Sequence, residues 1–421
     1  MLKLNTAGYS AAALSCATFF CLDINAHAET GNISGNQFNP AISLILDGRY
    51  SQYHDDFELP GVIVGPEAEL PANGFSLGHS ELTISANVDD VFYGSTSLAF
   101  HEHDGETEVE LEEAYLETLG LGHGASIKFG RFLSNIGYMN SQHEHAWTFY
   151  DAPLIYNALF GKALYDDGVQ LRWLAPTDVY LEFGAEFSRG ERFPGGTSTK
   201  GNQGRALFAK IGSDLGNNAS WQLGLSSYTT AYDQRSSEDH HHEETDHEAE
   251  FLLQNGDVQI SGVDGVFKWA PTGNPQHQQW VLQAEYFEKD EEAEARLEEH
   301  SDAGDASILN QYDGVLSGYY AQIGYRFHPQ WRTAIRYEAI EPDNQFTVLQ
   351  SDGIDPDEFL EETELGSDET ITRNSIMLEY NHSEFSRIRL QYNHSDWSED
   401  RDDLWLIQYT MSLGSHGAHQ Y

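Results

Sequence analysis

A period-two alternation of apolar and polar side chains recurs along the chain, and it constrains the fold more than any other feature. In residues 319–327, 331–337, 387–392 and 405–413, apolar or aromatic residues occupy every second position, and mostly polar or small residues lie between them. A period of two with one apolar and one polar face predicts β-strands, because successive side chains of a strand point to opposite faces. The chain is therefore expected to be all-β.

The connections between the predicted strands distinguish a barrel from a sandwich. Sixteen strands are predicted at residues 41–53, 74–88, 91–103, 108–121, 125–133, 168–175, 179–189, 204–213, 219–230, 258–270, 278–288, 315–327, 330–341, 371–382, 385–396 and 403–413. Short turns alternate with longer connections, three of which are acidic and lie near 231–257, 289–314 and 342–370. An even strand number with turns on one side and long loops on the other is typical of transmembrane antiparallel β-barrels of the Gram-negative outer membrane. A sandwich has no reason to sort its loops in this way.

The first 28 residues are predicted to be a signal peptide rather than part of the fold. Lys3 precedes an apolar stretch at 7–22, and Ala26-His27-Ala28 forms a small-residue cleavage site. A transmembrane anchor is the alternative, but the apolar stretch is short for a span. The mature barrel is thus expected to cover 29–421, exported to the outer membrane. The two cysteines, Cys16 and Cys21, both precede residue 29.

The charge of the chain excludes some partners. The formal net charge is −46, so phosphate backbones would be repelled and nucleic acid is not an expected partner. Cations are favoured instead, together with outer-membrane lipid and lipopolysaccharide, whose anionic groups divalent ions can bridge to acidic loops. No cofactor is required by any motif: Gly-x-Ser-x-Gly, His-Glu-x-x-His and Walker-type loops are absent, and no enzymatic activity is expected.

Residues 238–250 combine histidines and carboxylates without any lysine or arginine. Neutral imidazole and carboxylate oxygen are ligands that Zn²⁺ and similar divalent ions take at neutral pH. We therefore predict weak, multi-site metal capture; the alternative is a solvated acidic loop without a ligand. The candidate ligands in this segment are His240, His241, His242, Glu243, Glu244, Asp246 and His247.

Loop 134–167 carries a second candidate metal site and enough apolar residues to fold back into the barrel. His143 and His145 fall on one side of an extended segment, and Asp151 could complete a site with them. The alternative is that the aromatic residues pack against the barrel wall and the histidines are ordinary polar lining.

Several basic residues fall on the polar faces of predicted strands. A charge facing lipid at mid-depth is unfavourable by about 2–4 kcal/mol, so these side chains should face the lumen. Lumen charge, rather than loop charge, sets selectivity at a constriction. The predicted channel-lining residues are Lys128, Arg172, Arg326, Arg332, Arg336, Arg387 and Arg389.

The segment 111–117, a tight turn and then 127–132 resemble a porin strand pair. "Ala-Tyr-Leu" at 114–116 followed by "Phe-Gly-Arg-Phe" at 129–132 is most similar to the phosphate-selective and related general porins. The resemblance implies a barrel of 16 strands, often trimeric, whose third loop folds into the lumen as a constriction. No lysine-rich stretch occurs in the long loops, which departs from the phosphate-selective members.

The expected function is a porin-type channel that passes small hydrophilic solutes or ions across the outer membrane, with zinc or other divalent ions captured by the histidine-acid loops. Two alternatives remain open. One is an anion-selective porin for phosphate. The other is a TonB-dependent-type metal receptor, which would need an N-terminal plug and more strands than the chain has room for.

Overall fold

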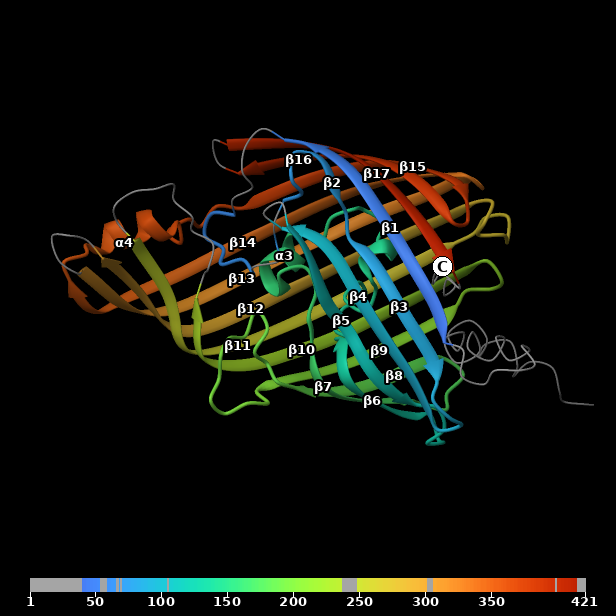
Figure 1. Cartoon of the computed structure of the whole chain (residues 1–421), viewed down its shortest axis with the longest axis horizontal. Coiled ribbons are helices and arrows are strands. Elements are labelled where there is room, and N and C mark those ends of the chain that lie inside the picture. Colours follow the sequence, from blue (N-terminus) through green and yellow to red (C-terminus); the bar gives the residue numbers. More distant parts are fainter. Residues whose placement is uncertain are drawn as a thin grey trace, which may run out of the picture.

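The computed structural model describes residues 40–53, 59–65, 68, 70–103, 106–236, 248–300, 306–397 and 400–414. Within these ranges the chain forms one closed antiparallel β-barrel (Figure 1). Its strands are β1 (Ala41–Gln52), β2 (Gly74–Leu77), β3 (Ser80–Asn87), β4 (Phe92–His103), β5 (Glu106–Thr118), β6 (Ala125–Leu133), β7 (Tyr165–Leu174), β8 (Tyr180–Ser188), β9 (Gly204–Asp214), β10 (Ala219–Ser236), β11 (Glu248–Trp269), β12 (Gln279–His300), β13 (Ala306–His328), β14 (Trp331–Asp352), β15 (Ile371–Ser383), β16 (Ser386–Trp397) and β17 (Asp400–Gly414). The described ranges also hold the 3-10 helix η1 (Glu144–Ala146) and the helices α3 (Leu154–Phe160) and α4 (Pro356–Thr363), and no helix in them is long and apolar enough to cross a bilayer.

The barrel closes between its first and last strands. From β3 onward each strand pairs with the next, and β1 pairs on one side with β17 and on the other with both β2 and β3. Because β2 and β3 lie end to end along β1, they count as one interrupted strand, and the described barrel has sixteen strands. The predicted all-β class, strand number and strand order are confirmed.

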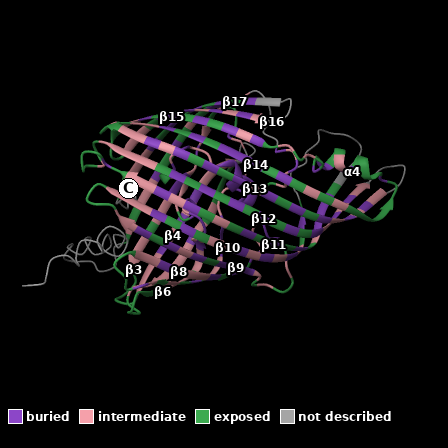
Figure 2. Cartoon of the chain, turned by 180° about the vertical axis from the view of Figure 1, so that it is seen from behind, coloured by how far each residue is buried: buried purple, intermediate pink, exposed green. Residues whose placement is uncertain are grey.

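Burial alternates along the strands as the sequence period requires (Figure 2). On β12, Gln283 and Glu285 point inward and are buried, while Leu282 and Tyr286, on either side of this pair, are exposed on the outer face. In water this arrangement would expose apolar surface and bury polar groups. In a bilayer it matches lipid to the apolar face and leaves the polar side chains inside the barrel.

The outer face switches from apolar to polar at one level across four neighbouring strands. Val263, Tyr286, Tyr319 and Ala339 lie opposite one another on β11 to β14. The adjacent row, two residues further from the short turns, consists of polar residues: Ser261, Glu288, Ser317 and Glu341. A polar row directly above an apolar one marks the outer edge of the hydrocarbon layer.

Beyond this level β11 to β14 continue outward and carry α4 past the ends of the other strands (Figure 1). Their inner face carries the buried pair Lys289 and Glu291 just beyond this level and is apolar further out. There Ala293, Ala295 and Leu297 on β12 pack in one buried cluster with Ile308 on β13 and Phe359 on α4. The prediction of long loops at 289–314 and 342–370 is therefore wrong in large part, since β12 reaches His300, β13 begins at Ala306 and β14 reaches Asp352. The predicted loop 231–257 shrinks likewise, because β10 ends at Ser236 and β11 begins at Glu248.

The level of the polar row can be tested on one strand. Ile335→Arg should lower the free energy of unfolding in lipid vesicles by about 2–4 kcal/mol, because Ile335 is exposed on the lipid face of β14. The control Glu341→Arg, on the same face above the switch, should change it by about 0–1 kcal/mol. Urea titration of both variants measures the difference; equal effects would place the lipid boundary elsewhere.

Candidate functional site

The third loop, residues 134–164 between β6 and β7, lies inside the barrel and is called L3 below (Figure 1). Its helix α3 is apolar on nearly all sides, and all seven of its residues are buried. A helix of that kind needs a surrounding core, and α3 packs against β13 and β14. Gly161 ends it in the left-handed conformation, with φ +62°. The prediction that the third loop folds into the lumen is confirmed.

Glu285 of β12 fastens the first part of L3 to the barrel wall. Its carboxylate accepts hydrogen bonds from the backbone N–H groups of Tyr138 and Met139, both at 3.0 Å, and from the Tyr156 hydroxyl at 2.9 Å. Gly137 makes this approach possible: its φ is +64°, and a Cβ there would lie 2.4 Å from Glu285 Oε2. Glycine is needed at that position for both reasons.

Five arginines from β14, β15 and β16 fasten the second part of L3, and we call them the arginine wall: Arg332, Arg336, Arg373, Arg387 and Arg389. Each donates to a backbone carbonyl of the loop, for example Arg389 Nη2 to Trp147 O at 3.0 Å and Arg387 Nη2 to His145 O at 2.6 Å. The others reach the carbonyls of Thr148, Asp151 and Ala152. These cations therefore hold the loop.

Carboxylates accompany the arginine wall. Glu338, fully buried, lies 2.7 Å from Arg336 Nε and 2.8 Å from Arg373 Nε, and Glu379 pairs with Arg389 at 3.0 Å. Glu338 also accepts the backbone N–H of Leu154, at the start of α3, at 2.6 Å. The wall thus resembles a set of ion pairs more than a free row of cations.

Asp151 of L3 belongs to this network. Its carboxylate lies 2.9 Å from Arg336 and 3.0 Å from Arg373, and it accepts from Gln391 and Asn393 on β16. Burial disfavours its charge, but Arg336 and Arg373 outweigh burial and hold the pKa of Asp151 below its usual range. The expectation that Asp151 completes a metal site with His143 and His145 is not met, because its oxygens are bound by arginine and amide groups.

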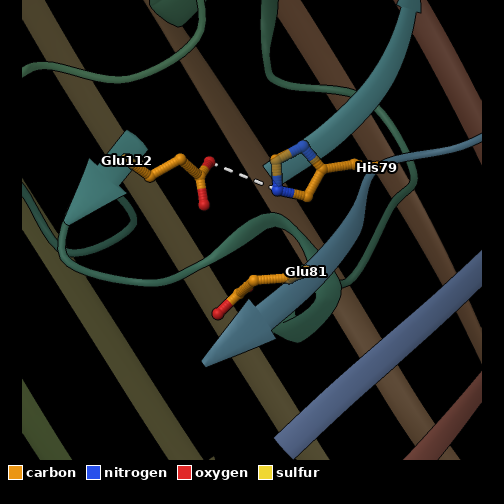
Figure 3. Close-up of side chains that lie close together, drawn as sticks. All are labelled: His79, Glu81 and Glu112. Atoms are coloured by element: carbon orange, nitrogen blue, oxygen red, sulfur yellow. Dashed lines mark ion pairs between the residues drawn. The ribbon is translucent and has the colours of Figure 1, made fainter. Parts of the chain in front are cut away.

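His143 and His145 instead join a group of histidines and glutamates near β3 and β5, called the His–Glu cluster. It combines residues of L3 with residues from the β2–β3 break and from β5: His79, Glu81, Glu112, Glu113, His143, Glu144 and His145. Figure 3 shows His79 and Glu112 facing each other, with Glu81 beside them on β3. His79 Nε2 lies 3.2 Å from Glu112, and His143 Nδ1 lies 3.3 Å from Glu81.

Two backbone irregularities bring the wall residues of this cluster to the inner face. Along β1, Gly48 pairs with Leu77 and Ile45 pairs with Glu81, so one extra residue is accommodated where β2 passes into β3. Along β4, Ser97 pairs with Glu113 but Leu98 pairs with Leu111, which leaves Glu112 as the extra residue of a bulge. Bulges redirect side chains, and they concentrate near functional sites.

The remaining predicted lining residues occupy several environments. Lys128 lies 4.3 Å above the Tyr115 ring, and Arg172 pairs with Glu117. Arg326 is near the short-turn end, where it donates to Pro329 O at 3.1 Å. The residues His240, His241, His242, Glu243, Glu244, Asp246 and His247 lie outside the described ranges.

The sequence did not identify four of the barrel residues that hold L3 or pair with the arginine wall. Arg373 and Glu379 alternate with Ile376 and Leu378 in the strand predicted at 371–382, so their shared face was visible in the sequence. Glu285 and Glu338 occupy polar positions of predicted strands in the same way. Nothing in the sequence near these residues predicted how they would be placed relative to L3.

A sixteen-strand barrel with a lipid-facing apolar band and a loop folded into its lumen defines an outer-membrane channel of the porin type. The chain belongs to the family described as "Phosphate-selective porin O and P", whose sequence model matches residues 66–352. A relative from Aquifex aeolicus (strain VF5), printed as an uncharacterized protein, is 31% identical over 421 residues and covers 92% of this chain and 81% of its own length.

Solved structures show the same fold at low identity. OmpT of Vibrio cholerae in its trimer form is 10% identical, with a TM-score of 0.53, over 89% of this chain and 99% of that one. The outer membrane channel DcaP of Acinetobacter baumannii is 12% identical, with a TM-score of 0.51, over 89% of this chain and 97% of that one. An anion-selective porin from Comamonas acidovorans is 10% identical, with a TM-score of 0.51, over 89% and 99%.

Proposed function

We propose that the channel passes small hydrophilic solutes by diffusion and prefers cations to anions. The observation that carries this proposal is the state of the arginine wall: its arginines pair with Glu338, Glu379 and Asp151 and bind L3 carbonyls. Bound in this way, they offer little free positive charge to a passing anion. The acidic outer rows on β12 and β14 and the net charge of −46 concentrate cations at the mouth.

A phosphate-selective channel is the second candidate, supported by the family description and by the arginines of β14 to β16. The two proposals predict opposite signs of ion selectivity. They also differ in how phosphate affects the current, since an anion-selective site occupied by phosphate would block chloride.

Reversal potentials in planar bilayers separate the two. Under a tenfold KCl gradient a cation-preferring pore lets K⁺ cross toward the dilute side, so that side becomes positive, with an ideal limit of about 59 mV. We expect that sign, and no block of the current by millimolar phosphate. The opposite sign together with phosphate block would establish the anion-selective alternative.

We also propose that residues 238–250, whose histidines and carboxylates include His240 to His242 and His247, capture zinc or other divalent ions weakly at the channel mouth.

A homotrimer is proposed from the trimer form of the Vibrio cholerae OmpT structure, and light scattering of the detergent-solubilised protein tests it. Export by cleavage after Ala28 is tested by N-terminal sequencing of the mature protein.

A further inference from the structure

We propose that His79, Glu81 and Glu112, joined by His143 of L3, bind one divalent transition-metal ion of the zinc class inside the barrel. This site is separate from residues 238–250, and the inference does not depend on the ion selectivity of the channel. Ligand atoms of His79, Glu81 and Glu112 all lie within 4.8 Å of one another. His143 Nδ1 lies 3.3 Å from Glu81 Oε2 and 3.7 Å from Glu112 Oε2, so it approaches two of these three groups and is the proposed fourth donor.

The charges of the His–Glu cluster call for a cation. Glu81, Glu112, Glu113 and Glu144 bring four carboxylates into a largely buried space. Lys162 pairs with Glu144 at 3.2 Å, and Lys128 is near enough to Glu113 to attract it. Arg49, which interacts with Glu144, adds a third cation. Three cations do not balance four carboxylates, so the remaining positive charge must come from the histidines or from a bound metal ion.

Two buried polar atoms point into the same space without a hydrogen bond. The His79 side chain is only 10% exposed, and its Nε2 has no hydrogen-bond partner although Glu112 Oε1 is 3.2 Å away. Glu112 Oε2 is likewise buried without one. Their nearest partners are ion-pair neighbours, Glu112 Oε1 at 3.2 Å from His79 Nε2 and His143 Nδ1 at 3.7 Å from Glu112 Oε2. Because buried polar atoms nearly always form hydrogen bonds, these two atoms are open to a shared ligand.

The donor set fits zinc and its neighbours. Two imidazole nitrogens and two carboxylate oxygens give the four ligands that Zn²⁺ takes, whereas Ca²⁺ and Mg²⁺ prefer sites made only of oxygen. His145 supports the arrangement from L3, since its Nδ1 lies 3.0 Å from Glu81 Oε2. A ligating carboxylate held by an outer hydrogen bond is typical of metal sites.

Such an ion would join L3 to β3 and β5, which are separated from the arginine wall by β17 and β1. His143 is the donor that L3 contributes, and the wall supplies the other three. Metal binding at this point would therefore give L3 a second attachment, beside His145, whose backbone carbonyl accepts from Arg387.

Calorimetric titration of the full-length mature protein with ZnCl₂ tests the site. We expect His79→Gln and Glu112→Gln each to reduce the number of zinc ions bound per chain by one, or to weaken that binding step by more than about tenfold. His143→Gln should do the same without altering the barrel wall. The matched control His277→Gln, in an exposed short turn, should bind zinc as the wild type does.

Each outcome decides the proposal. Heat-modifiable migration in gels confirms that the variants are folded, and His143→Gln remains informative should a wall variant misfold. Deleting residues 238–250 should leave the binding step at His79 intact. The proposal is overturned when the three variants bind as much zinc, as tightly, as the wild type, or when the loop deletion alone abolishes all zinc binding.

Discussion

Replacing Glu338 with alanine should free L3 from β14 and lower the free energy of unfolding by about 3–5 kcal/mol. Glu338 is fully buried. Its carboxylate forms ion pairs with Arg336 and Arg373 and accepts a hydrogen bond from the Leu154 N–H at the start of α3. Without it, two buried arginines must share Asp151, and a buried backbone donor loses its acceptor. Urea unfolding of the protein in lipid vesicles measures the change.

The control for this variant is Glu341→Ala, on the same strand but exposed to water above the lipid boundary. It removes the same charge and should change stability by less than about 0.5 kcal/mol. Limited proteolysis adds a second measurement, since a released L3 should be cut faster in Glu338→Ala than in the control. Equal stability and equal cleavage in the two variants would show that Glu338 does not hold the loop.

The strand pattern could be predicted because period-two alternation is a local property. Each of the sixteen predicted segments overlaps a strand of the barrel, with β2 and β3 together corresponding to one of them. The position of L3 could be predicted from its aromatic and aliphatic content, which resists exposure to water. The porin resemblance added the same expectation for the third loop.

The extension of β11 to β14 beyond the lipid boundary was not predicted, because its many charged residues are typical of a loop. The outward positions of β12 are occupied by Glu288, Asp290, Glu292 and Glu294. Such a density of carboxylates indicates a solvated loop unless their spacing, at every second residue, is taken into account. The small inward residues between them, such as Ala293, are too weak a signal by themselves. Their partners are Ile308 and Phe359, far enough along the chain that only the folded structure brings them together.

The His–Glu cluster could be predicted only in part, and the reason is geometric. Strict alternation would place Glu112 and Glu113 on opposite faces of β5, but a bulge turns both inward. His79 similarly depends on the break between β2 and β3. Bulges leave no reliable trace in one sequence, whereas His-x-His at 143–145 was visible. Asp151 was assigned to the wrong group because its arginines lie some 200 residues away.

Replacing residues 141–160 of L3 with a glycine-serine linker of equal length should have the largest effect on the channel. This segment includes η1 and α3, and its buried side chains fill the lumen between the His–Glu cluster and the arginine wall. A linker without anchoring side chains would let water through, so single-channel conductance should rise several-fold. The replacement removes Glu144 and Asp151 but no lysine or arginine, so selectivity should shift toward anions.

The direction of that shift follows from the groups left behind. The five arginines of the wall would face water with Glu338 and Glu379 as their remaining carboxylate partners, which gives this side of the pore a positive excess. Planar-bilayer recordings give both the conductance and the reversal potential. The same linker in place of residues 238–247 serves as the control and should leave conductance near the wild-type value. Unchanged conductance in the L3 variant would mean that the constriction lies elsewhere in the barrel.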